Sequence, residues 1–206
     1  MFKWPALFSV PDLAMPLFAP VTLTTSRLVL RPLRHEDVQA FFAIWSDAEA
    51  MRYFSFSAMT HLDQATDRVA RLLKTSDEGK DLGCVVTLKT TGEAIGKCDL
   101  FHVDEQCRRA EIGFSLQRRH WGRGYMAEAA SAVIEHAFGT LDLRRIEADI
   151  DPRNAASARL LERLGFLHEG LLRERWLVGD EVSDSALYGL LARDYQSRKV
   201  SGHLEA

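Results

Sequence analysis

The sequence lacks the signatures of several classes of protein. Its 3 cysteines form no Cys-x-x-Cys pair, and the group Cys98, His102 and Cys107 has no second pair of ligands that would indicate zinc. No apolar run is long enough to span a membrane. The net charge of −3 gives no basic excess of the kind that nucleic-acid-binding proteins carry. We therefore expect neither metal, membrane nor nucleic acid as a partner, and the cysteines suit a reducing cytoplasm.

Hydrophobic residues make up 47% of the 206 residues, which is enough for one domain with a sizeable core. The first twenty residues are apolar and aromatic, but prolines interrupt them and the only basic residue there is Lys3, which is a poor fit to a signal peptide. We interpret them as an arm that packs on the domain or on a partner. A homodimer is compatible with the sequence. The predicted division is an arm over 1–22, one domain over 23–195 and a tail over 196–206.

Hydrophobic periodicity predicts strands and helices along the whole domain. The expected strands are 28–32, 84–90, 93–102, 110–116, 145–150, 167–178 and 183–191, and the expected helices are 35–45, 60–73, 125–138 and 155–164. The turn at Thr91-Gly92 joins two of the strands as a hairpin. The order β-α-α-β-β-β-α-β-α-β-β suits a mixed sheet with helices on both faces.

Two glycines lie where a strand gives way to a helix, in the segment Arg119-His120-Trp121-Gly122-Arg123-Gly124. A helix N-terminus gathers unpaired N–H groups and the positive end of the helix dipole. Glycines there let a ligand approach the backbone closely. The segment is therefore predicted to form an anion-binding site, and the anion bound at such sites is most often phosphate.

Two phosphate-binding motifs compete for this loop. A Walker loop needs a Gly-Lys-Ser/Thr ending, which the chain does not contain. The dinucleotide fingerprint fits in its relaxed form, Gly122-x-Gly124-x-x-Ala127, with Asp149 or Asp151 at about the right distance. However, residues 117–121 separate the strand from the glycines, and the preceding strands are typical of an antiparallel meander. A nicotinamide enzyme is therefore disfavoured.

The loop motif Arg119-x-x-Gly122-x-Gly124 is followed by Asp151-Pro152-Arg153-Asn154-x-x-Ser157 and by Leu164-Gly165-Phe166. In these motifs and their order the chain resembles the GNAT N-acetyltransferase superfamily, which uses acetyl-CoA. The opening segment 23–33 is similar to the branch that includes the RimJ and RimL ribosomal-protein N-terminal acetyltransferases. The resemblance covers about 23–195. It implies a single-domain α/β fold with a mixed, mostly antiparallel, twisted sheet and helices on both faces.

The resemblance also implies where acetyl-CoA would bind. Backbone N–H groups of the glycine loop would bind the pyrophosphate, and the pantetheine would lie along the 110–116 strand like an added strand. Arg119 and Arg123 would add charge, although each alone is nearly as well explained as a solvated surface arginine. The expected cofactor-binding residues are Phe114, Ser115, Leu116, Arg119, Gly122, Arg123, Gly124, Tyr125, Met126, Ala127, Asn154 and Ser157.

Glu111, Asn154 and Ser157 are the candidate catalytic residues. Glu111 lies in an otherwise apolar strand, where burial would raise its pKa and suit it to act as the general base. The alternative is an outward-facing carboxylate paired with Arg109. Asn154 is suited to cap a helix. The resemblance implies that its side chain also hydrogen-bonds to the pantetheine or to an ordered water. Many relatives carry a tyrosine acid where this chain has Leu161, so Ser157 or water would protonate the thiolate.

The acceptor pocket is expected between residues 51–57 and the turn at Gly179. Its expected lining is Tyr53, Phe54, Phe56 and Trp176, although aromatic residues there are as well explained as core. No cysteine motif argues for an acyl-enzyme, so we expect direct transfer in a ternary complex. The favoured acceptor is a protein N-terminal α-amine. The alternatives are a small-molecule amine, such as a polyamine, amino acid or antibiotic, and a catalytically silent acyl-CoA-binding module.

Overall fold

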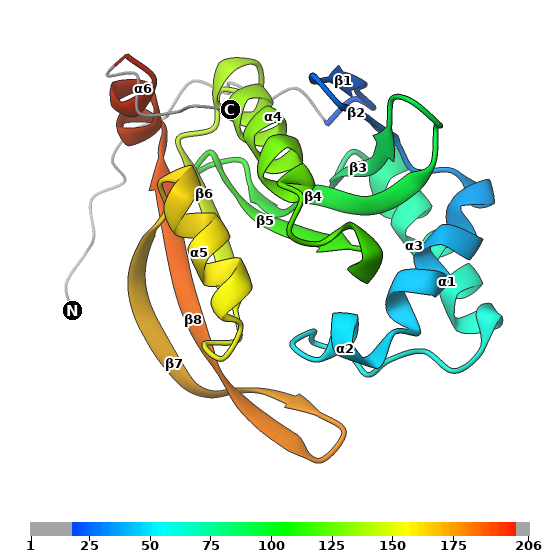
Figure 1. The fold of residues 1–206 in the computed structure, drawn as a ribbon. Helices are drawn as coiled ribbons and strands as arrows, with labels where there is room; N and C mark the ends of the chain where they lie inside the picture. The colour runs from blue at the N-terminus through cyan, green and yellow to red at the C-terminus, as the bar shows by residue number, and fades with distance from the viewer. Residues whose placement is uncertain (1–17, 201–206) are drawn as a thin grey trace, which may run out of the picture.

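The computed structural model describes residues 18–200 (Figure 1). Its strands are β1 (Leu23–Thr24), β2 (Leu28–Pro32), β3 (Leu82–Leu88), β4 (Ala94–Asp104), β5 (Arg109–Leu116), β6 (Arg145–Ile150), β7 (Leu167–Val178) and β8 (Glu181–Leu191). Its α-helices are α1 (Val38–Trp45), α2 (Ala48–Met51), α3 (Leu62–Asp77), α4 (Tyr125–Gly139), α5 (Ala155–Leu164) and α6 (Ala192–Val200), and the 3-10 turns η1 (His35–Asp37) and η2 (Arg118–His120) precede α1 and α4. The predicted order is confirmed, with β1, α2 and α6 added to it.

The strands form one mixed sheet in the order β1-β2-β3-β4-β5-β6-β8-β7. All neighbours within it run antiparallel except β5 and β6, which are parallel. A parallel pair needs a crossover, and α4 supplies it between β5 and β6. The mixed, mostly antiparallel sheet expected from the sequence is therefore confirmed.

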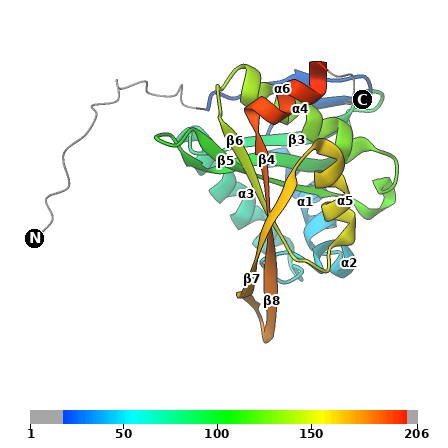
Figure 2. The same cartoon turned by 90° about the vertical axis from the view of Figure 1, so that its left-hand side faces the viewer.

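Helices cover both faces of the sheet (Figures 1 and 2). On one face, α4 and α5 pack on the sheet through a core that includes Val133, Ile134 and Leu161, each of them 0% exposed. On the other face, α1 and α3 pack against each other and against β3 through a second cluster, which includes Phe41, Trp45 and Val85. The cavity described below adjoins this second cluster, since Phe41, Trp45 and Val85 also line its wall.

The helices that flank the site begin and end at residues suited to those positions. The Asn154 side chain accepts a hydrogen bond from the Ser157 N–H at 3.1 Å and so caps α5, as predicted. The same helix ends at Gly165, also as predicted. Helix α6 runs to Val200 and so crosses the predicted domain boundary at residue 196. Most of the predicted arm, residues 1–17, lies outside the described residues, but Phe18 is buried in the core.

Candidate active site

The parallel strands β5 and β6 diverge after a short stretch of pairing. Register pairs join Arg109 to Arg145, Ala110 to Ile146 and Glu111 to Glu147, and β5 then continues to Leu116 without β6 beside it. A strand edge without a neighbour presents backbone N–H and C=O groups that can pair with an extended ligand. The gap between the two strands therefore has the shape and the chemistry to hold a pantetheine-like chain.

The glycine loop lies beyond the C-terminal end of β5 and leads into α4. Gly122 and Gly124 have φ values of 71° and 76°, a region that L side chains seldom adopt. The first helical hydrogen bond of α4 runs from the Glu128 N–H to the Gly124 carbonyl, and no side chain caps the helix. The N–H groups of Tyr125, Met126 and Ala127 are thus free of helical acceptors and stand at the positive end of a 15-residue helix. This geometry suits a pyrophosphate.

A loop before β2 holds the start of α4 in place. The Glu128 carboxylate accepts hydrogen bonds from the Thr25 and Ser26 hydroxyls and from the Arg27 backbone and side chain. Burial raises the pKa of Glu128, but these bonds outweigh it and lower that pKa to about 2. The Arg27 guanidinium also lies over the Tyr125 ring and donates to the Arg123 carbonyl at 2.9 Å. Sequence reasoning gave Thr25, Ser26, Arg27 and Glu128 no role in the site.

The two arginines expected to bind phosphate differ in their surroundings. The Arg119 guanidinium is engaged by the Glu93 carboxylate and by the His120 ring, whereas Arg123 is exposed on the glycine loop. Trp121 donates from Nε1 to the Leu116 carbonyl at 2.8 Å and so fastens the loop to the end of β5. Arg123 is therefore the better placed of the two for an added contact to phosphate.

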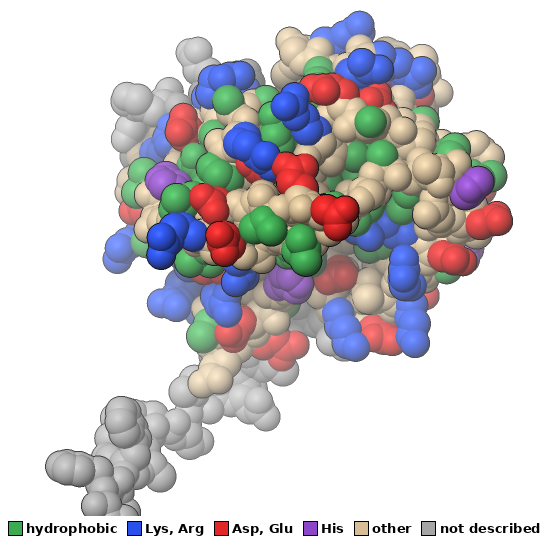
Figure 3. Space-filling view, turned by 90° about the horizontal axis from the view of Figure 1, so that it is seen from below, with side chains coloured by type: hydrophobic (Ala, Val, Ile, Leu, Met, Phe, Trp, Pro, Cys, Tyr) green, Lys and Arg blue, Asp and Glu red, His purple; other side chains and the backbone are tan. Residues whose placement is uncertain are grey.

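A cavity of about 1340 Å³ opens on the sheet face that α1 and α3 only partly cover. Its wall brings together many of the predicted residues, namely Tyr53, Phe54, Phe56, Glu111, Phe114, Ser115, Asn154, Ser157 and Trp176. The glycine loop and Leu116 are not part of this wall. Acidic and basic side chains are interspersed on the face seen from below (Figure 3).

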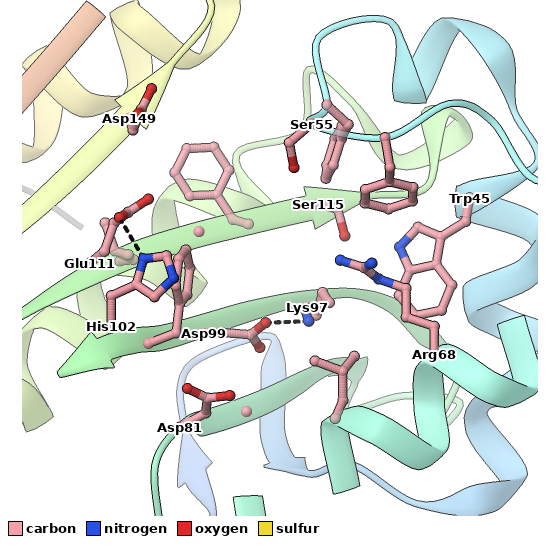
Figure 4. A pocket seen from close by; sticks show the side chains of 18 of the residues that line it. Trp45, Ser55, Arg68, Asp81, Lys97, Asp99, His102, Glu111, Ser115 and Asp149 are labelled. Carbon is pink, nitrogen blue, oxygen red and sulfur yellow. Dashed lines mark hydrogen bonds and ion pairs between the residues drawn. The ribbon is translucent and has the colours of Figure 1, made fainter. Parts of the chain in front are cut away.

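Glu111 points into this cavity from β5 and is bound to a histidine (Figure 4). His102 Nδ1 lies 3.1 Å from Glu111 Oε2. Burial raises the pKa of the Glu111 carboxyl, the His102 contact opposes that rise, and the nearby Asp149 and Glu147 add to it. Arg109, the partner considered for Glu111 from the sequence, instead binds Glu147 at 2.7 Å.

His102 is a site residue that sequence reasoning missed. It lies on β4 next to a break in the β4–β5 register, with φ at 50°, and this bulge aims its ring across to Glu111. A non-glycine residue at positive φ is uncommon and is often found at functional sites. The sequence carries no clear signal for this bulge.

Asn154 and Ser157 face the cavity from the start of α5. Both are half-buried, and the Asn154 Oδ1 is already used as the helix cap. Beside them on β6, Asp149 accepts a hydrogen bond from the buried Ser185 hydroxyl and lies 3.8 Å from Arg175. Leu161 is 0% exposed in the core, so the position of the family's tyrosine acid is apolar here. Ser157, four residues before Leu161, remains the candidate hydroxyl for protonating the thiolate.

The aromatic residues predicted for the acceptor pocket also gather at the cavity. Phe54 and Phe56 pack edge to face with their ring centroids 5.8 Å apart. The guanidinium groups of Arg52 and Arg153 lie 5.4 and 5.9 Å from the Tyr53 ring centroid. Trp176 is 39% exposed on β7. Within residues 18–200, no group of three or more His, Cys, Asp or Glu side chains is arranged to hold a metal ion.

Residues 27–167 match the model of the acetyltransferase (GNAT) domain family. The chain belongs to the GNAT acetyltransferases. It is 38% identical over 174 residues to the uncharacterized N-acetyltransferase p20 of Bacillus licheniformis, a match that covers 84% of this chain and 98% of that protein. This membership makes it an acetyl-CoA-dependent N-acetyltransferase, and it removes the nicotinamide alternative.

Solved structures of the same fold include RimJ and a spermidine N-acetyltransferase. Mycobacterium smegmatis RimJ, in complex with CoA-disulfide, aligns with a TM-score of 0.75 and 24% identity over 85% of this chain and 90% of that one. Spermidine N-acetyltransferase of Vibrio cholerae, in complex with CoA and spermine, aligns with a TM-score of 0.74 and 22% identity over 84% of this chain and 99% of that one. At these identities the likeness establishes the fold and leaves the acceptor open. No helix among residues 18–200 is long and apolar enough to cross a membrane.

Proposed function

We propose that this GNAT enzyme transfers the acetyl group of acetyl-CoA to the N-terminal α-amine of a protein or peptide, as a RimJ/RimL-like enzyme. The pyrophosphate would bind the N–H groups at the start of α4, and the pantetheine would lie in the gap between β5 and β6. The free donors of Tyr125, Met126 and Ala127 and the unpaired edge of β5 support this placement. The three free cysteines suit a cytoplasmic setting.

Glu111 serves as the base in this proposal. A neutral amine attacks the thioester carbonyl carbon, the C–S bond breaks, and the proton lost by the amine nitrogen passes to the Glu111 carboxylate, directly or through water. Backbone N–H groups in the segment from Phe114 to Leu116 would stabilise the oxyanion. The thiolate would take its proton from Ser157 or from water, since Leu161 offers none. Asn154 would hold the pantetheine or an ordered water while it caps α5.

An α-amine is the easier substrate because it is more often neutral. Its pKa is near 8 and that of a lysine amine near 10.4, so it requires about 3 kcal/mol less help to lose its proton at neutral pH. The Glu111 carboxylate, with its raised pKa, is a base suited to this smaller demand.

The observation that carries the choice of acceptor is the mixed charge of the cavity wall. Six cations line it, namely Arg52, Arg68, Lys80, Lys97, Arg153 and Arg175, alongside eight carboxylates. Five of these carboxylates, namely Glu78, Asp99, Asp149, Asp151 and Glu181, are paired with the lining cations. A polyamine would need free carboxylates for its several positive charges. A peptide N-terminus brings one amine followed by a neutral backbone, and it is the better match.

The test is thiol release from acetyl-CoA with a panel of acceptors. The panel contains short peptides with free N-termini, lysine peptides with blocked termini, polyamines, amino acids and aminoglycosides. We expect turnover on free peptide N-termini only. Turnover confined to small amines would overturn the acceptor class. Cofactor binding without turnover on any member of the panel would also overturn the peptide acceptor and point to an amine of another class.

A further inference from the structure

Arg68 is a cation in the cavity wall that makes no hydrogen bond to any other residue within 18–200. It projects from α3 with its guanidinium 3.9 Å from the Phe56 ring centroid and 5.5 Å from that of Trp45. Its Nε is buried and makes no hydrogen bond to any described residue. Burial lowers the pKa of Arg68, Arg71 adds to this and Asp99 opposes it, yet an arginine stays charged at neutral pH. The two rings orient the cation and leave its N–H groups available.

Ser115 presents a second unused polar group to the same part of the cavity. It is 7% exposed on β5, and its Oγ is buried with no hydrogen-bond partner among the described residues. In Figure 4 the Ser115 hydroxyl and the Arg68 guanidinium point into the same space from opposite walls. A buried polar group without a partner is costly and usually marks a place that a ligand or water fills.

The neighbouring charges do not neutralise this pair. Lys97 lies on β4 directly opposite Ser115 of β5. Its ammonium is bound to the buried Asp99 carboxylate. The Asp99 carboxylate also accepts a hydrogen bond from the Cys84 N–H at 3.3 Å. Arg68 therefore keeps free N–H donors in the same part of the cavity as the Ser115 hydroxyl, while Lys97 is neutralised by Asp99.

We propose that Arg68 and Ser115 bind a carboxylate of the acceptor, so that the preferred N-termini carry Asp or Glu within their first two residues. This inference rests on the proposed function. A guanidinium and a hydroxyl that both donate into one space are the usual partners of a carboxylate. A backbone carbonyl would use only part of this donor set and would not balance the charge.

The spacing along β5 fits such an acceptor. Glu111 and Ser115 lie on the same face of the strand, four residues apart, which is about 13 Å at ~3.3 Å per residue. An acceptor that reaches both groups must place its α-amine and its carboxylate several ångströms apart, which an Asp or Glu side chain on its first or second residue can do.

The experiment compares matched peptides that carry Glu, Gln or Lys at position 1 or 2. With the wild-type enzyme we expect kcat/KM for the better Glu peptide to exceed that of its Gln counterpart by about tenfold or more, as for a charge-assisted contact. The ratio of kcat/KM between the Glu and Gln peptides should fall close to one in Arg68→Gln. In Ser115→Ala and Arg68→Lys it should take a value between one and the wild-type ratio. Arg71→Gln is the control, because Arg71 is an exposed residue one helical turn further along α3 and does not line the cavity.

Each outcome separates this inference from the proposed function. Peptide turnover without an acid preference, or an acid preference that survives in Arg68→Gln, would overturn the carboxylate site and leave the α-amine acceptor standing. A preference for free glutamate over glutamine, lost in Arg68→Gln and seen without peptide turnover, would keep the carboxylate site and overturn the peptide acceptor. Binding of CoA by Arg68→Gln with wild-type affinity confirms that the variant is folded.

Discussion

Replacing Glu111 by Gln tests the chemistry directly, because the amide keeps the size of the side chain and removes its ability to accept a proton. General-base catalysis typically contributes 10²–10⁴-fold, so we expect kcat to fall by that factor, equivalent to about 3–5 kcal/mol. The affinity for CoA should stay within about twofold, since Glu111 lies in the paired part of β5, away from the glycine loop. Glu49→Gln is the control, because Glu49 is exposed on α2 and does not line the cavity.

The pH dependence sharpens this test. The acceptor amine must be neutral and Glu111 must be ionised, so log(kcat/KM) of the wild type rises with a slope of two below both pKa values. In Glu111→Gln the slope falls to one, because only the amine still titrates. His102→Ala removes a contact that lowers the pKa of Glu111, so the Glu111 limb moves to higher pH. A Gln variant with wild-type activity and an unchanged profile would remove Glu111 as the base.

For Glu111→Gln we expect a loss of activity but no loss of stability. The pKa of Glu111 is raised in the folded state, so the fold favours the protonated carboxyl. Its contribution to stability is therefore most favourable below the unfolded pKa and is lost as pH rises through the folded pKa. At neutral pH, Glu111→Gln should unfold at the same temperature as the wild type or higher, as judged by thermal denaturation. A large loss of Tm would mean that Glu111 has a structural role.

Three further predictions concern the elements around the site. Gly124→Val forces a β-branched residue into φ 76° and should weaken CoA binding at least tenfold by calorimetry; unchanged affinity would mean that the loop is not the phosphate site. Glu128→Gln should lower the free energy of unfolding at pH 7 by about 1–3 kcal/mol, and because the folded pKa of Glu128 is about 2, this difference should shrink as pH falls below about 4.5 in urea titrations. Asn154→Ala should lose about 1 kcal/mol with the α5 cap, and a fall in kcat beyond that of an equally destabilised core variant would indicate the additional role.

Local signals predicted the elements that have clear ends. Strand β6 has the predicted bounds of 145–150, and α5 lies between its cap at Asn154 and its stop at Gly165. Helix α2 was not predicted, because four residues carry too little periodicity and the helix depends on hydrogen bonds from the Glu49 and Ala50 N–H groups to the Asp47 side chain. The two-residue strand β1 was missed for the same reason of length.

The candidate site was predictable where local signals in the sequence pointed to it. The glycine loop and Asn154 belong to contiguous patterns, and Glu111 was conspicuous as a carboxylate in an apolar strand. The partners of these residues come from other parts of the chain. His102 reaches Glu111 through a bulge, and Arg68 reaches the cavity because α3 packs on the sheet. Such contacts depend on tertiary packing, which no spacing along the sequence encodes.

Because β5 and β6 diverge, the sheet consists of two parts that are joined along a short stretch. One part contains β1 to β5, the other contains β6 to β8, and within the sheet only the register pairs from Arg109 to Glu111 connect them. A chain-like cosubstrate in the gap would hydrogen-bond to both parts and take the place of a strand between them. Its binding would then slow amide exchange on the facing edges of β5 and β6 together, so the bound cosubstrate would serve as a structural part of the enzyme that recognises the acceptor.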